Sequence, residues 1–215
     1  MVNAKPVIVP AILSASKTEL VQKLAAIAGL SDWLQIDITD GLFVSSKTID
    51  LSELNGVKIN ANLEIHLMTA RPVDFFAACQ AAGAQRVFFH SECAQTVEEV
   101  LAASKNFKFT IGLALKPATP VEEVQTYLNQ VGAVLVLSVE PGYQGGEFIP
   151  AVLNKIKQLK TLAPGLAVSI DGGINSDNIK ITATAGADYL VIGSAIWQNT
   201  DIAKSVKRLV DIINS

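Results

Sequence analysis

The chain has 215 residues, of which 50% are hydrophobic and only 17% are charged, and its formal net charge is −3. This composition favours a protein with a large, well-covered core over an open or disordered chain. No cluster of Lys and Arg residues is present, which argues against nucleic acid and acidic membrane surfaces as partners. We expect one domain that spans residues 1–215.

The cysteines and the apolar segments indicate a cellular compartment. Cys79 and Cys93 are too few and too irregularly spaced for a disulfide framework or a thiolate metal site, so we expect buried thiols in a reducing compartment. No uncharged apolar run reaches the roughly 18 residues of a membrane span. Pro6 and Pro10 interrupt an N-terminal stretch that faintly resembles a signal peptide. We therefore predict a cytoplasmic protein.

Strand-like and helical segments alternate along the chain. The predicted strands cover residues 7–13, 33–38, 62–67, 85–90, 108–115, 133–139, 166–171 and 188–192. The predicted helices cover residues 17–28, 72–82, 95–105, 120–129, 149–162, 176–185 and 201–213, with short turns at 51–54 and 194–198. Gly-Ala pairs that begin at Gly83, Gly132 and Gly186 mark returns from helix to strand, as glycines at helix C-termini do.

This alternation predicts the fold. Strands separated by helices pair in parallel through right-handed crossovers. Eight such units in a chain of this size predict a closed (β/α)8 TIM barrel. An open doubly wound sheet is the alternative, but it usually has fewer strands. The first turn, Leu13-Ser14-Ala15-Ser16, also lacks the glycine fingerprint of a dinucleotide site.

The second predicted strand carries polar residues near one end of the predicted barrel. It carries Gln35 and Asp37 on the face opposite Leu34, Ile36 and Ile38, and its apolar flanks indicate that the polar face points into a covered site. Active sites of such barrels lie at the C-terminal ends of the strands. Those ends carry Ser14, Asp37, His66, His90, Lys116, Ser138 with Glu140, Asp171, and Gly193-Ser194.

Two aspartates and one histidine are the candidate reactive residues. Asp37 and Asp171 end strands two and seven, on opposite sides of the predicted mouth, and two flanking carboxylates suit removal of a proton from one face and its return on the other. An Asp often caps the following helix, but two glycines and several loop residues separate Asp171 from its helix. His66 on the neighbouring third strand completes a donor set for a divalent metal, although a hydrogen-bonded core histidine is the alternative.

Glycine-rich loops follow the last three predicted strands. They contain Gly142, Gly145 and Gly146 after strand six, Gly172 and Gly173 after strand seven, and Gly193 with Ser194 after strand eight. Glycines let backbone N–H groups approach an anion, and a helix N-terminus adds partial positive charge. Loops seven and eight are where such barrels usually hold a phosphate. We predict a phosphate site from the three loops together, although any one pair alone is better explained as a tight turn.

Seven segments around these positions form an ordered set. They are Val9-Pro10-Ala11-Ile12-Leu13-Ser14-Ala15, Asp37-Ile38-Thr39-Asp40-Gly41, His66-Leu67-Met68, Lys116-Pro117-Ala118-Thr119-Pro120, Ser138-Val139-Glu140-Pro141-Gly142-Tyr143, Asp171-Gly172-Gly173-Ile174-Asn175 and Gly193-Ser194-Ala195-Ile196. Each segment alone is weak evidence for a protein family, but the ordered set is highly specific for one. Together the segments resemble ribulose-phosphate 3-epimerase and its relatives that act on other phosphorylated ketoses.

The resemblance implies a barrel of the ribulose-phosphate-binding type that epimerises a ketose phosphate at C3, such as ribulose 5-phosphate to xylulose 5-phosphate. Family enzymes use two aspartates as base and acid, and a divalent metal (zinc, manganese, iron or magnesium) holds the enediolate oxygens. By position, Asp37 and Asp171 become the acid–base pair and, with His66, metal ligands. Ser14, His66, the loop glycines and Ser194 become substrate or phosphate contacts. The family also implies a homo-oligomer.

The chain departs from the family pattern around the reacting carbons. Gln35 stands where the family has a fourth metal ligand, a histidine; its carbonyl oxygen can coordinate, but more weakly for zinc-like ions. Further departures are Ala11 for a serine, Thr39 and Leu137 for methionines, and the loop segments Leu42-Phe43-Val44-Ser45 and Gln144-Gly145-Gly146. Two alternatives stay open: a metal-independent phosphosugar isomerase or lyase, and a phosphosugar-binding barrel without turnover.

Overall fold

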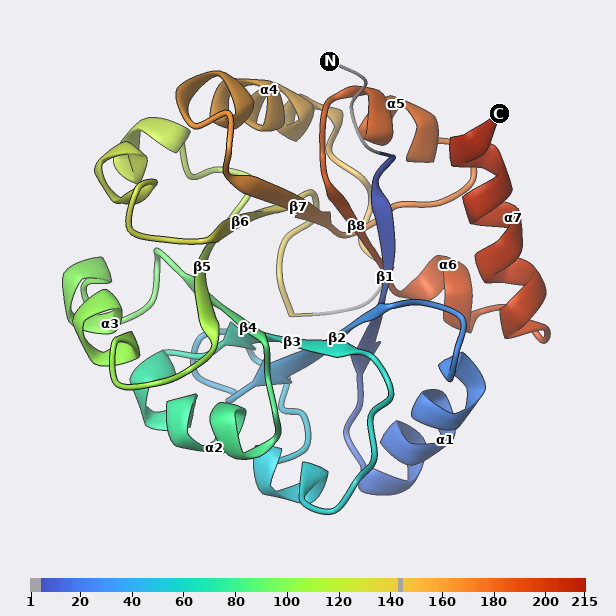
Figure 1. Ribbon diagram of the computed structural model, residues 1–215, viewed down its shortest axis with the longest axis horizontal. Helices are drawn as coiled ribbons and strands as arrows, with labels where there is room; N and C mark the ends of the chain where they lie inside the picture. Colours follow the sequence, from blue (N-terminus) through green and yellow to red (C-terminus); the bar gives the residue numbers. More distant parts are fainter. Residues whose placement is uncertain (1–4, 143–144) are drawn as a thin grey trace.

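The computed structural model describes residues 5–142 and 145–215. Its eight parallel strands close into a barrel in sequence order, with β8 beside β1 (Figure 1). The strands are β1 (Val7–Leu13), β2 (Trp33–Thr39), β3 (Asn62–Met68), β4 (Arg86–His90), β5 (Thr110–Leu115), β6 (Ala133–Leu137), β7 (Ala167–Asp171) and β8 (Tyr189–Ile192). The predicted (β/α)8 barrel is confirmed.

Helices surround the barrel in the connections between strands (Figure 1). They are α1 (Lys17–Ile27), α2 (Phe76–Ala81), α3 (Val97–Ser104), α4 (Leu153–Leu162), α5 (Ile179–Thr184), α6 (Ser194–Trp197) and α7 (Ile202–Asn214). Short 3₁₀ turns add Leu51–Leu54, Pro72–Phe75, Val121–Glu123, Gln125–Tyr127 and Pro150–Val152.

The predicted helix over 120–129 is wrong. The segment forms two 3₁₀ turns, Val121–Glu123 and Gln125–Tyr127, between β5 and β6. Val121 and Val124 are both buried and lie three residues apart, which suits a turn of three residues. The β-branched and aromatic residues of this segment also have low helix propensity. Intrinsic propensity therefore does not hold the segment as an α-helix, and burial of the two valines decides its conformation.

The barrel interior is filled mainly by small and apolar side chains. They are Val9, Ala11, Phe88, Ala114, Ala133, Leu135, Leu137 and Val191. Gly112 makes room for the Phe88 ring, because a Cβ at Gly112 would lie 2.5 Å from two ring carbons. The opposite faces of the strands pack under the helices and form the larger hydrophobic core.

A buried ion pair lies toward the amino-terminal end of the barrel. Arg86, the first residue of β4, donates to Glu64 of β3, with Nε 2.9 Å from Oε2. The guanidinium also lies 4.4 Å from the ring centroid of Trp33 and 4.2 Å from that of Tyr189. Burial raises the pKa of Glu64 above its usual range, while the Arg86 charge opposes this shift. Glu64 therefore belongs to a structural pair.

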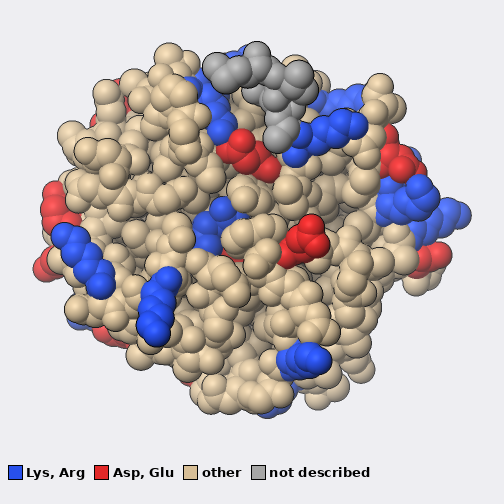
Figure 2. Space-filling view, viewed as in Figure 1, with Lys and Arg blue, Asp and Glu red and all other residues tan. Residues whose placement is uncertain are grey.

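The surface carries charges of both signs. Figure 2 shows one face on which basic and acidic side chains are interspersed, without a broad area of one sign. Cys79 is buried and Cys93 is half-buried, and both are free thiols. Within residues 5–142 and 145–215, no helix has the length and hydrophobicity needed to cross a bilayer.

Candidate active site

A cavity lies among the residues that end the strands and begin the following loops. It is lined by Ala11, Leu13, Asp37, His66, Met68, Leu137, Val139, Pro141, Gly142, Gly145, Gly146, Asp171, Gly172, Gly173, Ile174, Gly193 and Ser194. Every predicted site residue lines it except Ser14 and Gln35. The neighbouring Tyr143 and Gln144 lie outside the described residues. A largely apolar wall with a few converging polar groups is typical of a small-molecule site.

Sequence reasoning did not identify the apolar lining as part of the site. Leu13, Met68, Val139, Pro141 and Ile174 belong to this wall. Most of them lie within or directly beside the ordered segments quoted above, so their position in those segments is the signal that could have found them. Their side chains exclude water from part of the cavity.

Ser14 points away from the cavity. Its Oγ lies 2.8 Å from Oε2 of Glu19 and 2.9 Å from the backbone oxygen of Ser16, both at the start of α1. The side chain is buried against that helix. The structure therefore gives Ser14 a role in the β1–α1 connection, and its contact with substrate stays a prediction.

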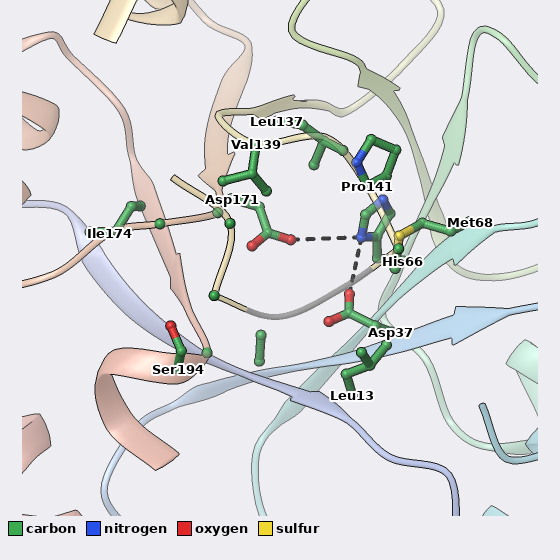
Figure 3. A pocket seen from close by; sticks show the side chains of 17 residues that line it. Leu13, Asp37, His66, Met68, Leu137, Val139, Pro141, Asp171, Ile174 and Ser194 are labelled. Carbon is green, nitrogen blue, oxygen red and sulfur yellow. Dashed lines mark hydrogen bonds and ion pairs between the residues drawn. The ribbon is translucent and has the colours of Figure 1, made fainter. Parts of the chain in front are cut away.

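Asp37, His66 and Asp171 converge at one side of the cavity. Asp37 and His66 are register partners on β2 and β3, and Asp171 ends β7. Nδ1 of His66 lies 3.0 Å from Oδ1 of Asp37 and 3.7 Å from Oδ2 of Asp171. Figure 3 shows both carboxylates directed toward the imidazole, Asp37 from β2 and Asp171 from β7. One ligand atom of each residue lies within 4.8 Å of the others, a spacing that can hold a metal ion.

Gln35 is fully buried and joins the two carboxylates. Its Nε2 donates to Oδ1 of Asp37 and to Oδ2 of Asp171, both at 2.8 Å. Because carboxylate oxygens accept hydrogen bonds, the amide turns its N–H groups toward them. The amide oxygen, Oε1, is buried without a hydrogen-bond partner.

This donor set fits a divalent cation. Two carboxylates and an imidazole nitrogen already converge, and the unpartnered oxygen of Gln35 is a neutral oxygen ligand that hard cations accept. Rotation of the Gln35 amide would exchange the positions of its nitrogen and oxygen. The coordination by Gln35 stays a prediction, because in this structure its nitrogen faces the carboxylates.

Burial and like charge change the protonation of the site. Burial, together with the nearby charge of Asp37, raises the pKa of Asp171 to about 7. Burial alone would lower the pKa of His66, but its hydrogen bond with Asp37 and the charges of Asp37 and Asp171 raise it above its usual value. Near neutral pH, Asp171 can therefore both hold and release a proton.

A second row of polar groups lies behind His66. Its Nε2 is 2.9 Å from Nε2 of His90, and Nδ1 of His90 is 3.2 Å from Oε2 of Glu92. Burial lowers the pKa of His90 to about 4. Burial opposes ionisation of Glu92, but hydrogen bonds from His90, Thr119 and Lys116 lower its pKa to about 2.

His90 was identified from the sequence only as a strand-end residue, and Glu92 was missed. The signal that could have found both is a carboxylate two residues after a histidine that ends a strand. The ring of Phe43 packs against that of His90, with the two ring centroids 4.7 Å apart.

Local backbone conformation and packing explain why glycine stands at two of these loop positions. Gly172 and Gly173 have φ angles of 112° and 64°, and a Cβ at Gly172 would lie 2.4 Å from Cγ2 of Val139. A Cβ at Gly173 would lie 2.8 Å from the backbone nitrogen of Phe148. These glycines allow the loops after β6 and β7 to pack closely together at the cavity. Phosphate binding there stays a prediction.

Comparisons with known proteins identify the family of this chain. The model of the Ribulose-phosphate 3 epimerase family matches residues 7–197. The chain is 36% identical to a ribulose-phosphate 3-epimerase of Mycobacterium tuberculosis over 210 residues, which cover 95% of this chain and 91% of that protein. It is 35% identical to the cytoplasmic isoform of Oryza sativa ribulose-phosphate 3-epimerase over 197 residues, 88% of this chain and 86% of that protein.

Solved structures agree with the fold. The 3-hexulose-6-phosphate synthase from Salmonella typhimurium superimposes with a TM-score of 0.73 over 97% of this chain and 98% of that chain. Its sequence identity is only 15%, so this similarity concerns the barrel alone.

Proposed function

This chain belongs to the ribulose-phosphate 3-epimerase family, and we propose that it is an isomerase that inverts C3 of a phosphorylated ketose, with D-ribulose 5-phosphate and D-xylulose 5-phosphate as the reference pair. The observation that carries this proposal is the pair of carboxylates, Asp37 from β2 and Asp171 from β7, which line one cavity and converge on the same imidazole (Figure 3). A site that only binds a sugar phosphate gains nothing from two facing carboxylates.

Two carboxylates can carry out epimerisation by moving one proton at each face. As base, Asp37 takes the proton from C3, and the C3–H electron pair forms a planar enediolate with the neighbouring carbonyl. As acid, Asp171 delivers a proton to the opposite face of C3, and the carbonyl forms again. Asp171 is suited to this part because its pKa of about 7 lets it hold a proton near neutral pH. The reverse reaction exchanges the two roles.

Asp37, His66 and Asp171 would hold a divalent metal, with Gln35 as a weaker fourth ligand. When bound, such an ion acts as a Lewis acid that stabilises negative charge on the substrate oxygens. The family resemblance supports zinc, manganese, iron or magnesium. The buried His66 keeps the two carboxylates apart and orients Asp37 through their 3.0 Å contact.

The glycines at the other side of the cavity would bind the phosphate. Gly145, Gly146, Gly172, Gly173 and Gly193 line this side, with Ser194 next to them. Backbone N–H groups of glycine loops can approach phosphate oxygens closely, and the Ser194 hydroxyl can donate a further hydrogen bond. Bound there, a ketose phosphate would extend its reacting carbons toward Asp37 and Asp171.

Proton exchange at C3 tests the proposal. The metal-reconstituted protein is incubated with D-ribulose 5-phosphate in D₂O, and the sugars are followed by NMR, with hexulose phosphates in parallel. We expect deuterium at C3 and formation of the C3 epimer of at least one sugar. A protein with bound metal that exchanges and converts none of these sugars would contradict the proposal.

The two alternatives, a metal-independent isomerase or lyase and a binding barrel without turnover, are not favoured by the family match. We further propose, from the resemblance, a cytoplasmic homo-oligomer. Sedimentation velocity at micromolar concentration tests the oligomer, and a mass equal to one chain would contradict it.

A further inference from the structure

We propose that Glu92 and His90 are positioning residues that determine which ring nitrogen of His66 carries a proton and leave Nδ1 of His66 free to donate its electron pair to a cation. This inference rests on the metal ligands named in the proposed function. The observation behind it is a continuous row of contacts that runs from Glu92 through both imidazole rings to Asp37.

Glu92 is the fixed end of this row. Its Oε1 accepts the backbone N–H of Lys116 at 2.9 Å and the hydroxyl of Thr119. A backbone N–H can only donate, so the atom at this position must be an acceptor. The low pKa of Glu92 agrees with a carboxylate that accepts on both oxygens. Oε2 of the ionised carboxylate can likewise only accept, so Nδ1 of His90, 3.2 Å away, is the donor in this contact.

The proton positions on both rings follow from this anchor. A neutral imidazole with a proton on Nδ1 has an electron pair on Nε2. His90 is completely buried, and because its Nδ1 donates to Glu92, the Nε2 of its neutral ring accepts. Nε2 of His66, at 2.9 Å, must then carry a proton and donate it. In the neutral ring, Nδ1 of His66 is left without a proton.

That bare nitrogen faces two carboxylates. Nδ1 of His66 lies 3.0 Å from Asp37 and 3.7 Å from Asp171. Three acceptors directed at one point need a positive group between them: the proton of the His66–Asp37 hydrogen bond in the metal-free protein, or a bound cation in its place. The row from Glu92 thus prepares His66 as a metal ligand. The hydrogen bond at Nε2 of His66 holds the proton there and leaves Nδ1 as the nitrogen that binds the metal.

The substitution Glu92→Gln changes one atom and reverses the direction of hydrogen-bond donation along the row. The Gln oxygen is required opposite the Lys116 N–H and the Thr119 hydroxyl, so the NH₂ group faces Nδ1 of His90. His90 must then accept on Nδ1 and donate from Nε2, and His66 must carry its proton on Nδ1. A protonated Nδ1 cannot bind a metal.

The experiment combines a direct reading of the rings with metal affinity. The chain contains only His66 and His90, so protein labelled with nitrogen-15 histidine gives two imidazole patterns, and His90→Asn assigns them. In zinc-loaded wild-type protein we expect a proton on Nδ1 of His90 and on Nε2 of His66. Competition with a chromophoric chelator should give roughly 10–100-fold weaker zinc binding for Glu92→Gln than for wild type.

Glu122→Gln is the matched control, because it makes the same change at a carboxylate that accepts a hydrogen bond from the exposed Gln158. It should leave zinc affinity and both ring patterns unchanged. A proton on Nε2 of His90 in the wild type, or unchanged zinc affinity in a folded Glu92→Gln, overturns the inference. The nitrogen-15 pattern of the wild-type rings tests the inference even if the Glu92→Gln variant fails to fold. A wild type with the expected ring pattern that turns over no ketose phosphate would instead contradict the proposed function alone.

Discussion

Gln35 and Asp171 are 136 residues apart in the chain, yet Nε2 of Gln35 lies 2.8 Å from Oδ2 of Asp171. The same nitrogen lies 2.8 Å from Oδ1 of Asp37. The amide therefore fixes the separation of the two carboxylates from beneath. Because the side chain is neutral and can present either oxygen or nitrogen, it can serve the site with and without a cation.

Gln35→His should tighten zinc binding. An imidazole is a better ligand than an amide oxygen for zinc-like ions, so we expect at least about a tenfold gain in affinity. Chelator competition measures the gain, and Gln35→Leu, which offers no ligand, should weaken binding instead. Epimerisation should persist in Gln35→His. A variant that gains no zinc affinity and loses an existing activity would show that the metal-dependent interpretation is wrong.

Asp171→Asn should stop epimerisation but leave proton exchange at one face. Loss of a general acid costs about 10²–10⁴-fold in rate. With Asp37 intact, the variant should still exchange the C3 proton of one epimer with D₂O, and Asp37→Asn should exchange only the other. NMR of each pure epimer separates the two cases. If both variants exchange both epimers at the wild-type rate, neither aspartate is the acid or the base.

Asp171 should also make the metal-free protein less stable as pH rises. Its pKa of about 7 in the folded state exceeds the ordinary value of 3.8, so the folded chain binds more protons between these values. The free energy of unfolding then falls as pH rises from about 4 to about 7, by at most about 1.4 kcal/mol per pH unit for one proton. His66 contributes in the same direction, because its hydrogen bond with Asp37 and the charges of Asp37 and Asp171 raise its pKa against the effect of burial.

Urea unfolding in the presence of a chelator measures this effect. Asp171→Asn should lose this part of the pH dependence and gain stability relative to wild type as pH rises toward 8. Parallel curves for the two proteins between pH 5 and pH 8 would contradict the raised pKa of Asp171.

Much of the fold follows from the sequence because its signals are local. Strand alternation and the apolar periodicity of helices such as the predicted 17–28 identify the units, and eight alternating units leave few topologies. The segment 121–127 could not be predicted in the same way, because two valines three residues apart fit an α-helix and 3₁₀ turns equally well. Its conformation depends on how Val121 and Val124 pack against the barrel.

The site was predictable only in part, for a related reason. Asp37 and Asp171 could be placed because each ends a strand, and strand ends converge. The bridge made by Gln35 depends on the rotation of one amide across the barrel, and the row from Glu92 to His66 depends on ring orientations. These are set by three-dimensional hydrogen bonding, which leaves no periodic signal in a sequence.

Arg86→Met should destabilise the barrel without touching the cavity. The change leaves Glu64 buried without its cation and removes contacts with the rings of Trp33 and Tyr189, so we expect a loss of about 3–5 kcal/mol in the free energy of unfolding. Glu64→Met combined with Arg86→Met removes both charges and should recover most of that loss, because an apolar pair needs no compensation. Urea unfolding at pH 7 compares the three proteins. If the double variant is as unstable as Arg86→Met, the loss comes from packing of the Arg86 side chain against the rings, and the unpaired carboxylate is not its cause.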